Sequence, residues 1–417
     1  MCLPSRRFPS TRPRGPRWTR VVLSGLLAAC GLSGRGRAAT TEPSQSVFCA
    51  PAATREMLHD LCEYVAAEKA GMPTIFIGGY YMRTLVAGHQ VFGDRRYLER
   101  ALTYGDWLLA RQGGDGFWKT GYGDIYLADT GSALGLLMVL NRHADPGRQA
   151  RYRAAMQRYI AAVQANRLIQ PSGAFGVGFR TKAQGTVLVP WRDEYTISSA
   201  LSGGVVCTWL YHATQDARYR ELAHQALGWI MSTQRDDGAI PYVLKGDGGD
   251  LAKRGDPATD FVLWEKHRFQ AVAYVGEAVI AFDRYCDQPA WRRRLRDQAG
   301  ATVEFLLRTQ NADGTWGYKD SENPARSYDQ KRSPGVSHLL VWYYTNVRAD
   351  DRVAAAVRRF NAFLLNRANQ RGFGLLQAGG DASNPSPLGA FTQNDVVTAL
   401  TGRALADMLQ PGIDAHW

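Results

Sequence analysis

Two kinds of apolar pattern alternate along most of the chain. In residues 350–368, Val353, Val357 and Phe360 recur at helical spacing and arginines occupy the rest of the turn, which is typical of a helix with one buried face. Residues 131–140 are instead apolar or small on all sides, which indicates a fully buried helix. Segments of the two kinds are expected at residues 53–70, 77–92, 94–111, 126–143, 148–166, 196–215, 216–234, 268–285, 289–309, 335–348, 350–368 and 392–409.

The alternation of these segments predicts how the helices are arranged. Amphipathic segments such as 94–111 should lie outside with one face in water, and apolar segments such as 197–211 and 396–405 should lie inside. Six pairs of an inner and an outer helix form an (α/α)6 toroid, an all-α fold in which the last helix packs near the first. We therefore expect one large domain at residues 51–417.

A short helix-ending motif recurs through the chain. At residues 310–316 a helix-like run is followed by Gln-Asn-Ala-Asp-Gly-Thr-Trp, and similar or looser copies start at Gln112, Gln170, Gln234 and Gln370. Asp-Gly tolerates the positive φ angle that often ends a helix, and the Trp can fold back onto the helix before it. The starting glutamines are 58, 64, 76 and 60 residues apart, which leaves room for two helices of about 15–20 residues and their loops. The repeat unit is therefore predicted to be a helical hairpin.

The motif also resembles the repeats of a known superfamily. Over about residues 50–410 the chain resembles the α/α-toroid proteins, whose repeats are best known in terpene cyclases and whose helix stops recur in six-hairpin glycosidases, toroid polysaccharide lyases and glucuronyl epimerases. The resemblance implies a scaffold and leaves the reaction open. It departs from the terpene cyclases because no DxDD motif is present. Two copies carry the resemblance most clearly: Trp107-Leu108-Leu109 before Gln112, Gly116 and Trp118, and Phe305-Leu306-Leu307 before Gln310, Gly314 and Trp316.

The first 29 residues have the features of an export signal. They hold six arginines and no acidic residue, and they end in a short apolar run at residues 21–29, which is too short to span a bilayer. Leu27-Ala28-Ala29-Cys30 resembles the lipobox of bacterial lipoproteins, which implies cleavage before Cys30, lipidation of its thiol and a tether at residues 30–50. The alternative is a secreted protein cut near Ala38-Ala39. We expect the mature chain in the periplasm, at the outer membrane or on the cell surface.

Charge and cysteine content exclude several kinds of site. The net charge is +12, and removal of six arginines with the signal leaves 12 − 6 = +6 without a concentrated basic patch, so nucleic acid is not an expected partner. No CxxC or HExxH motif occurs, so no metal or other cofactor is expected.

Four cysteines follow the signal, and they allow three disulfide pairings: Cys49, Cys62, Cys207 and Cys286. Proximity in the chain favours the pair of Cys49 with Cys62. Cys207 is expected to be a buried free thiol.

Candidate chemistry gathers in the loops that lead into the inner helices, which should converge at one mouth of the ring. Five loops, at residues 122–129, 190–195, 260–268, 327–334 and 391–395, place aromatic residues beside polar ones, mostly carboxylates. Aromatic faces stack on sugar rings, and a mostly apolar hollow with a few polar groups is typical of a small-molecule site. We therefore expect a carbohydrate ligand held by Asp124, Asp129, Trp191, Arg192, Tyr195, Trp264, Arg268, Tyr328, His338 and Asp395.

An inverting glycoside hydrolase acting on an oligo- or polysaccharide is the favoured function. Inversion needs two carboxylates about 6.5–9.5 Å apart, one of them protonated by its environment. Glu265 is the candidate acid, and Asp193 or Glu194 is the candidate base. Arg192 and Arg268 are suited to a uronate carboxylate on the substrate.

Two other functions stay open. A polysaccharide lyase or uronyl C5-epimerase needs a base beside a uronate carboxylate, for which His267, His338 and Tyr195 are candidates. A non-catalytic surface lipoprotein would use the mouth only to bind a glycan or a protein. Structural roles compete for the same residues: Asp124, Asp193 and Asp395 stand where helix N-caps occur, and His338 fits a hydrogen-bonded core histidine.

Overall fold

The computed structural model of the 417-residue chain describes residues 46–69, 75–119, 124–182, 187–245, 261–317, 333–366, 370–371, 375–376 and 393–413. Most of these residues are helical. The helices are α1 (Pro51–Tyr64) with the π-helix η1 (Val65–Lys69), α2 (Ile75–Phe92), α3 (Arg95–Leu109), α4 (Leu127–Asn141), α5 (Pro146–Ala165), the continuous rod of α6 (Thr196–Ser198), η2 (Ser199–Cys207) and α7 (Thr208–Thr214), α8 (Ala217–Thr233), α10 (Phe261–Tyr285), α11 (Pro289–Thr309), α12 (Ser333–Asn346), α13 (Asp351–Leu365) and α14 (Gln393–Leu409).

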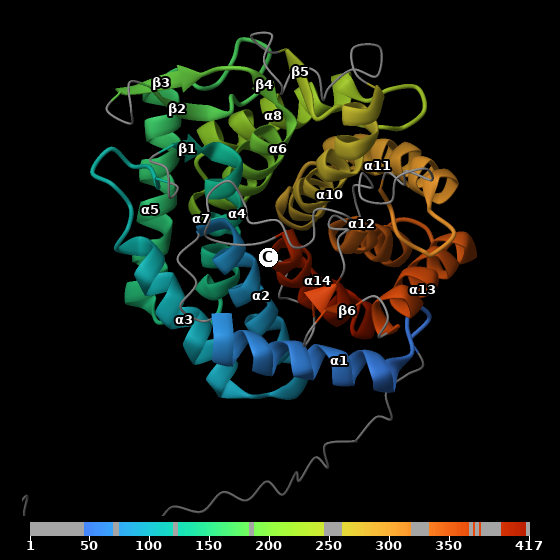
Figure 1. Ribbon diagram of the computed structural model, residues 1–417. Coiled ribbons are helices and arrows are strands. Elements are labelled where there is room, and N and C mark those ends of the chain that lie inside the picture. The colour runs from blue at the N-terminus through green and yellow to red at the C-terminus, as the bar shows by residue number, and fades with distance from the viewer. Residues whose placement is uncertain are drawn as a thin grey trace, which may run out of the picture. The chain divides into compact units, whose positions relative to one another are not determined.

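Within the compact unit that starts at Pro43, the helices form two concentric rings (Figure 1). Each inner helix contacts the next in the order α2, α4, η2, α10, α12 and α14, and α14 contacts α2. The outer helices α1, α3, α5, α8, α11 and α13 pack against the inner ones, with α1 beside α14. The predicted (α/α)6 toroid is therefore confirmed, including the last helix beside the first.

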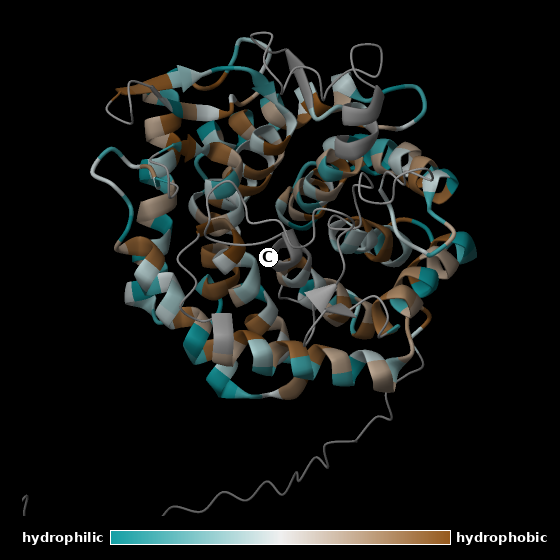
Figure 2. Ribbon diagram, viewed as in Figure 1, coloured by the Kyte–Doolittle hydropathy of each residue, from teal (hydrophilic) through white to brown (hydrophobic). Residues whose placement is uncertain are grey.

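Burial separates the two rings as the apolar pattern predicts. Every residue of α4 from 130 to 140 is buried, whereas α13 exposes Arg352, Arg358 and Arg359 and buries its apolar face. Figure 2 shows the same contrast, with teal positions along the outer helices. One boundary was wrong: α10 begins at Phe261 rather than at residue 268, so the third expected loop is mostly helix. The buried ring of Trp264 lies within that extra helical stretch.

Three copies of the recurring motif fasten one outer helix to the next. In three copies the glutamine amide nitrogen donates to the glycine carbonyl of its own loop at 2.8–3.3 Å and to a carbonyl of the following outer helix at 2.8–3.0 Å. These contacts join α3 to α5, α8 to α11 and α11 to α13. The indole nitrogens of Trp118 and Trp316 donate to Leu108 and Leu306 in the helices that precede them. The predicted helix stops are thus also the ties between hairpins.

Short strands occupy the loops near the start of the inner helices. β1 (Ile125–Tyr126), β2 (Gly178–Lys182) and β3 (Val187–Trp191) form one antiparallel sheet. β4 (Glu194–Tyr195) pairs with β5 (Val243–Lys245), and β6 (Gln370–Arg371) pairs with β7 (Leu375–Leu376). A strand of the first sheet comes directly before α4, and a strand of the second sheet comes directly before α6. Two of the predicted ligand-binding loops enter the ring at these points.

The predicted disulfide between Cys49 and Cys62 is wrong. Both residues, like Cys207 and Cys286, are buried free thiols. Cys49 precedes α1 and Cys62 lies near its end, roughly 18 Å away along the helix, which is beyond the reach of a disulfide. Burial raises the pKa of the Cys62 and Cys207 thiols, so Cys207 is the buried, unreactive thiol that its apolar surroundings predict.

The expected signal at residues 1–29, Cys30 and most of the tether lie outside the described residues. The last tether residues, 46–50, pack on the toroid: Phe48 is buried, and the Ala50 amide donates to Asn361 in α13 at 3.1 Å. Within the described parts, no helix combines the length and apolar character needed to cross a membrane.

Candidate functional site

A pocket opens where the first inner helices begin. It lies among the N-terminal parts of α2, α4 and α6 and the middle of α10, and its described walls enclose about 180 Å³. We call it the mouth pocket. Half of its described lining residues are aromatic, and the others include one carboxylate, one amide and one serine hydroxyl: Phe76, Tyr126, Ala128, Asp129, Ser132, Tyr195, Ile197, Tyr242, Gln270 and Tyr274.

Asp129 is the carboxylate of this lining, and the start of α4 places it there. Tyr126 in β1 is the N-cap of α4, and Asp129 occupies the first turn. A carboxylate is favoured there because the free N–H groups of a helix start carry partial positive charge. Ser132 follows one turn later on the same face. The two side chains therefore present a negative and a hydrogen-bonding group on one side of the pocket.

Tyr195 and Tyr242 form a pair on another wall. Their hydroxyls lie 2.8 Å apart, and their rings meet edge to face at 5.2 Å. Tyr195 is held by its backbone as well, because its N–H donates to Phe175 and its carbonyl accepts from the Ser199 hydroxyl. The pairing of β4 with β5 brings the two tyrosines together from positions 47 residues apart.

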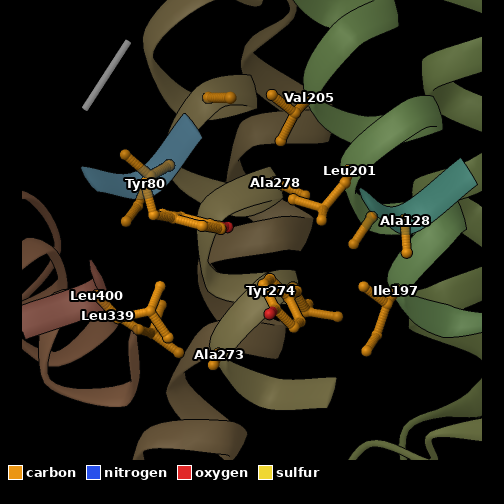
Figure 3. Packing of buried hydrophobic residues seen from close by; sticks show 14 of the residues in the cluster. Tyr80, Ala128, Ile197, Leu201, Val205, Ala273, Tyr274, Ala278, Leu339 and Leu400 are labelled. Atoms are coloured by element: carbon orange, nitrogen blue, oxygen red, sulfur yellow. The ribbon is translucent and has the colours of Figure 1, made fainter. Parts of the chain in front are cut away.

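α10 supplies the last wall through Gln270 and Tyr274, which are four residues apart and share one helix face. Figure 3 shows Tyr274 and Tyr80 among small and aliphatic side chains, which include residues of η2, α10, α12 and α14. Tyr80 meets Phe76 of the pocket edge to face at 5.6 Å. The pocket floor therefore continues directly into the buried core.

Below the floor lies a buried network of charged side chains, which we call the core network. Glu277 of α10 accepts hydrogen bonds from the Tyr80 hydroxyl at 2.8 Å, from Arg83 at 3.2 Å and from Arg403 at 3.1 Å. Arg403 also contacts His338 Nε2 at 3.1 Å, and His338 Nδ1 lies 2.8 Å from Asp407. All six residues are less than 5% exposed: Tyr80, Arg83, Glu277, His338, Arg403 and Asp407.

Hydrogen bonding indicates which ring nitrogen of His338 carries a proton. A guanidinium can only donate, so Nε2 of His338 must accept from Arg403 and Nδ1 must carry the proton that is donated to Asp407. Burial lowers the pKa of Arg83 to about 10, which leaves it charged at neutral pH. Two arginines then balance the carboxylates of Glu277 and Asp407. His338 is therefore the hydrogen-bonded core histidine that was the competing expectation, and it does not line the mouth pocket.

Of the residues predicted from the sequence, Asp129 and Tyr195 lie together in the mouth pocket. Trp191 lies beside it, with its ring 6.1 Å from that of Tyr126. Asp124 is also next to Tyr126, and its carboxylate accepts the Thr181 amide at 2.6 Å. The first two predicted loops therefore do converge at one mouth of the ring.

The two adjacent carboxylates Asp193 and Glu194 stand outside the lining. Asp193 accepts from the Trp191 indole at 2.9 Å, and Glu194 is buried and accepts from the Ser172 hydroxyl at 2.8 Å. Neither one caps α6, whose N-cap is Tyr195, and Asp124 does not cap α4. The helix-capping expectation for Asp193 and Asp124 is therefore wrong, because the short strands β4 and β1 separate these aspartates from the helices that follow.

Three more predicted binding residues lie away from the mouth pocket. Exposed Arg192 donates to the Arg167 carbonyl at 3.2 Å. Trp264 is buried beneath the Arg235 guanidinium, and Arg268 lies over the ring of Phe305 in outer helix α11. The backbones of Glu265 and His267 belong to α10 and that of Asp395 to α14, but their side chains, like all of Tyr328, lie outside the described residues. Their predicted roles stay predictions.

Sequence reasoning missed Phe76, Tyr242, Gln270 and Tyr274 in the pocket and most of the core network. The signal that could have found the network is a charged residue inside an apolar helix, such as Arg83 in α2 or Glu277 in α10. Among the described residues, no cluster of three or more His, Cys, Asp or Glu side chains is arranged to hold a metal ion.

Comparisons with known proteins agree with the fold. No protein-family model matches the chain, and no curated protein sequence is significantly similar to it. A polysaccharide lyase structure is 14% identical and superposes with a TM-score of 0.60, covering 86% of this chain and 97% of its own. An unsaturated glucuronyl hydrolase from Streptococcus agalactiae is 12% identical with a TM-score of 0.60, covering 89% and 95%.

A type II terpene cyclase from Scytonema shares the architecture too. It is 16% identical with a TM-score of 0.50, covering 85% of this chain and 98% of its own. Hydrolysis, elimination and cyclisation therefore occur on this scaffold, and the reaction has to be argued from the site. The chain has the fold of the α/α-toroid enzymes.

Proposed function

We propose that this chain is a carbohydrate-active enzyme whose substrate occupies the mouth pocket. The observation that carries the proposal is that five aromatic side chains line this pocket together with the carboxylate of Asp129 and the amide of Gln270. Aromatic faces pack on sugar rings, while the carboxylate and amide bind hydroxyls. The lyase and the glucuronyl hydrolase of the same fold are named for saccharide substrates, which favours a glycan over a terpene.

Glycoside hydrolysis by inversion is the reaction we favour. Asp129 supplies one of the two carboxylates that this chemistry requires. Glu265, the acid expected from the sequence, belongs to α10 five residues before Gln270, about 7.5 Å along the helix axis. In this scheme one carboxyl protonates the departing oxygen, and the other takes a proton from the attacking water.

Elimination is the second candidate, and the paired hydroxyls of Tyr195 and Tyr242 favour it. A lyase removes the proton beside a uronate carboxylate and protonates the leaving oxygen, which two hydrogen-bonded tyrosines can do between them. Helical periodicity also places position 267, a histidine, on the stripe of Gln270 and Tyr274.

Product analysis tests both reactions. The mature chain is incubated with a panel of neutral and uronate-containing bacterial and plant polysaccharides, and reducing ends and ultraviolet absorbance are followed. New reducing ends without absorbance support hydrolysis, and both signals together support elimination. If no polysaccharide is cleaved but one binds, the enzyme proposal fails and the chain is a glycan-binding protein.

We also propose that the chain is exported and anchored through a lipid on Cys30, because a basic segment, a short apolar run and a lipobox-like sequence follow one another at residues 1–30. Cells that express the full chain should place it in the membrane fraction and incorporate labelled palmitate. Cys30→Ala should abolish the label. A wild-type chain that is unlabelled and fully released would instead support cleavage near Ala38-Ala39.

A further inference from the structure

A second pocket opens at the opposite ends of the inner helices. It lies where α4, α7 and α10 finish and against outer helix α5, and it encloses about 270 Å³. Asn141 in its wall is twelve residues beyond Asp129 along α4, a separation of roughly 18 Å. The second pocket is therefore a separate site that the mouth pocket's substrate does not fill.

Its walls combine arginines with aromatic rings. Arg142, Arg153 and Gln149 provide hydrogen-bond donors, and Trp209, His212 and Tyr285 provide rings, while none of the described lining residues carries a carboxylate. Arg142 donates to the Tyr285 hydroxyl at 2.5 Å, and the His212 ring lies 4.7 Å from that of Tyr285. Trp209 is only 5% exposed, so it forms a fixed apolar floor beneath the charged rim.

The charge around this pocket is positive. Arg153 is half-buried on α5 and forms no ion pair or hydrogen bond with the described residues, so its guanidinium is available to a ligand. The Arg284 guanidinium lies 5.8 Å from the centre of the Tyr285 ring. Exposed Asp287, two residues after Tyr285 in the chain, accepts from Tyr211 at 3.3 Å and is not among the described lining residues. Burial and the neighbouring Arg142 lower the pKa of His212, consistent with an excess of positive charge here.

We propose that this second pocket binds a small ligand carrying a carboxylate or sulfate group, with Arg142 and Arg153 on the anionic group. Arginine suits such a group because its planar donors match two oxygens at once. The rings of Tyr285 and Trp209 would contact the apolar part of the ligand, as expected for an acidic sugar. The inference stands on this pocket alone and does not depend on the function proposed for the mouth pocket.

Calorimetric titration of the mature chain tests the inference with three probes: sodium glucuronate, its uncharged counterpart glucose, and sodium sulfate. Glucuronate should bind more tightly than glucose, and added salt should weaken its binding. Arg153→Gln should raise the Kd of the anion at least about tenfold, because it removes a charge-assisted hydrogen bond. Binding of sulfate without glucuronate would assign the pocket to free oxyanions.

Two control variants separate this site from other sources of binding. Arg100→Gln removes the same charge from exposed outer helix α3 and should leave the Kd unchanged. Asp129→Asn alters the mouth pocket and should also leave it unchanged. The inference is overturned if neither anion binds, if Arg100→Gln weakens binding as much as Arg153→Gln, or if only Asp129→Asn abolishes it.

Discussion

Asp129 is the residue on which the mouth pocket's chemistry depends most directly. It is the carboxylate among the described lining residues, it stands in the first turn of α4, and five aromatic side chains line the same pocket. A group in this position can bind a hydroxyl or exchange a proton with the substrate or a water molecule. The amide of asparagine keeps the shape and hydrogen bonds of the carboxylate but cannot take up a proton.

We therefore expect Asp129→Asn to lower kcat on any cleaved polysaccharide by at least about 100-fold, with little change in thermal stability. Steady-state rates and melting temperatures of the variant and of Asp297→Asn, an exposed aspartate on α11, give the comparison. A variant that keeps more than a tenth of the activity would limit Asp129 to substrate binding and move the chemistry to other groups.

At the scale of elements, the helix stops determine how neighbouring hairpins pack. Gly116 has a φ of +86°, and a Cβ on it would lie 2.9 Å from the Arg158 carbonyl of α5. Gly114, two residues earlier in the same loop, has nothing within 4 Å of its would-be Cβ. The same substitution at these two positions therefore separates backbone strain and crowding from the general effect of losing a glycine.

Gly116→Ala should lower the free energy of unfolding by about 2 kcal/mol or more, because alanine is strained at positive φ and meets the neighbouring helix. Gly114→Ala should change it by less than about 0.5 kcal/mol. Chemical denaturation of the two variants measures both values. Equal effects would mean that the stops do not hold the hairpins in place.

The helix stops, and the helices between them, are the part of the fold that could be predicted from the sequence. A glutamine, a glycine and a tryptophan at fixed spacing report local geometry, and the helices between them follow from apolar periodicity. The strand pair Gly178–Lys182 and Val187–Trp191 was not predicted, because strands this short are set by tertiary packing rather than by their own residues. β1 of that sheet separates Asp124 from α4, and β4 of the neighbouring sheet separates Asp193 from α6, so neither aspartate reaches the helix start where capping was expected.

The mouth pocket was predictable only in part for a similar reason. Asp129 and Tyr195 stood out because they lie in loops rich in aromatic and acidic residues. Gln270 and Tyr274 did not, because they lie inside an apolar helix and reach the pocket only through the packing of α10. Partners in the core network are as far as 197 residues apart in the chain, and no local pattern in a single sequence reveals such pairing.

At the scale of the whole molecule, the core network joins four of the six inner helices. Glu277 of α10 receives Tyr80 and Arg83 from α2 and Arg403 from α14, and His338 of α12 links Arg403 to Asp407. α2 and α14 are the first and last inner helices, so the network spans the point where the ring closes. Buried charges are costly unless they are paired, and here Glu277 pairs with one arginine from each of the two helices that meet where the ring closes.

Replacing Glu277 should therefore destabilise the whole toroid. Glu277→Gln leaves Arg83 and Arg403 buried with one carboxylate fewer, which should cost roughly 3–5 kcal/mol of unfolding free energy at pH 7. The matched control is Glu304→Gln, because the exposed Glu304 side chain on α11 also pairs with an arginine, Arg352. This substitution should lower the free energy of unfolding by less than about 1 kcal/mol. Denaturant unfolding of both variants measures the difference, and similar losses would show that the network does not stabilise the closed ring.

Acid should reveal the same network in the wild type. Burial alone would raise the pKa of Glu277, but Arg403 and Arg83 outweigh it and hold the pKa at about 2, below the ordinary 4.5. A carboxylate with a lowered pKa in the fold stabilises the protein above its unfolded pKa, and this contribution is lost as the pH falls through the folded value. Wild type should thus lose stability from about pH 4.5 down to pH 2, and Glu277→Gln, with no carboxylate to protonate at that position, should lose less. An identical pH dependence in the two proteins would mean that other carboxylates account for the loss, and that the charge of Glu277 does not couple ring closure to pH.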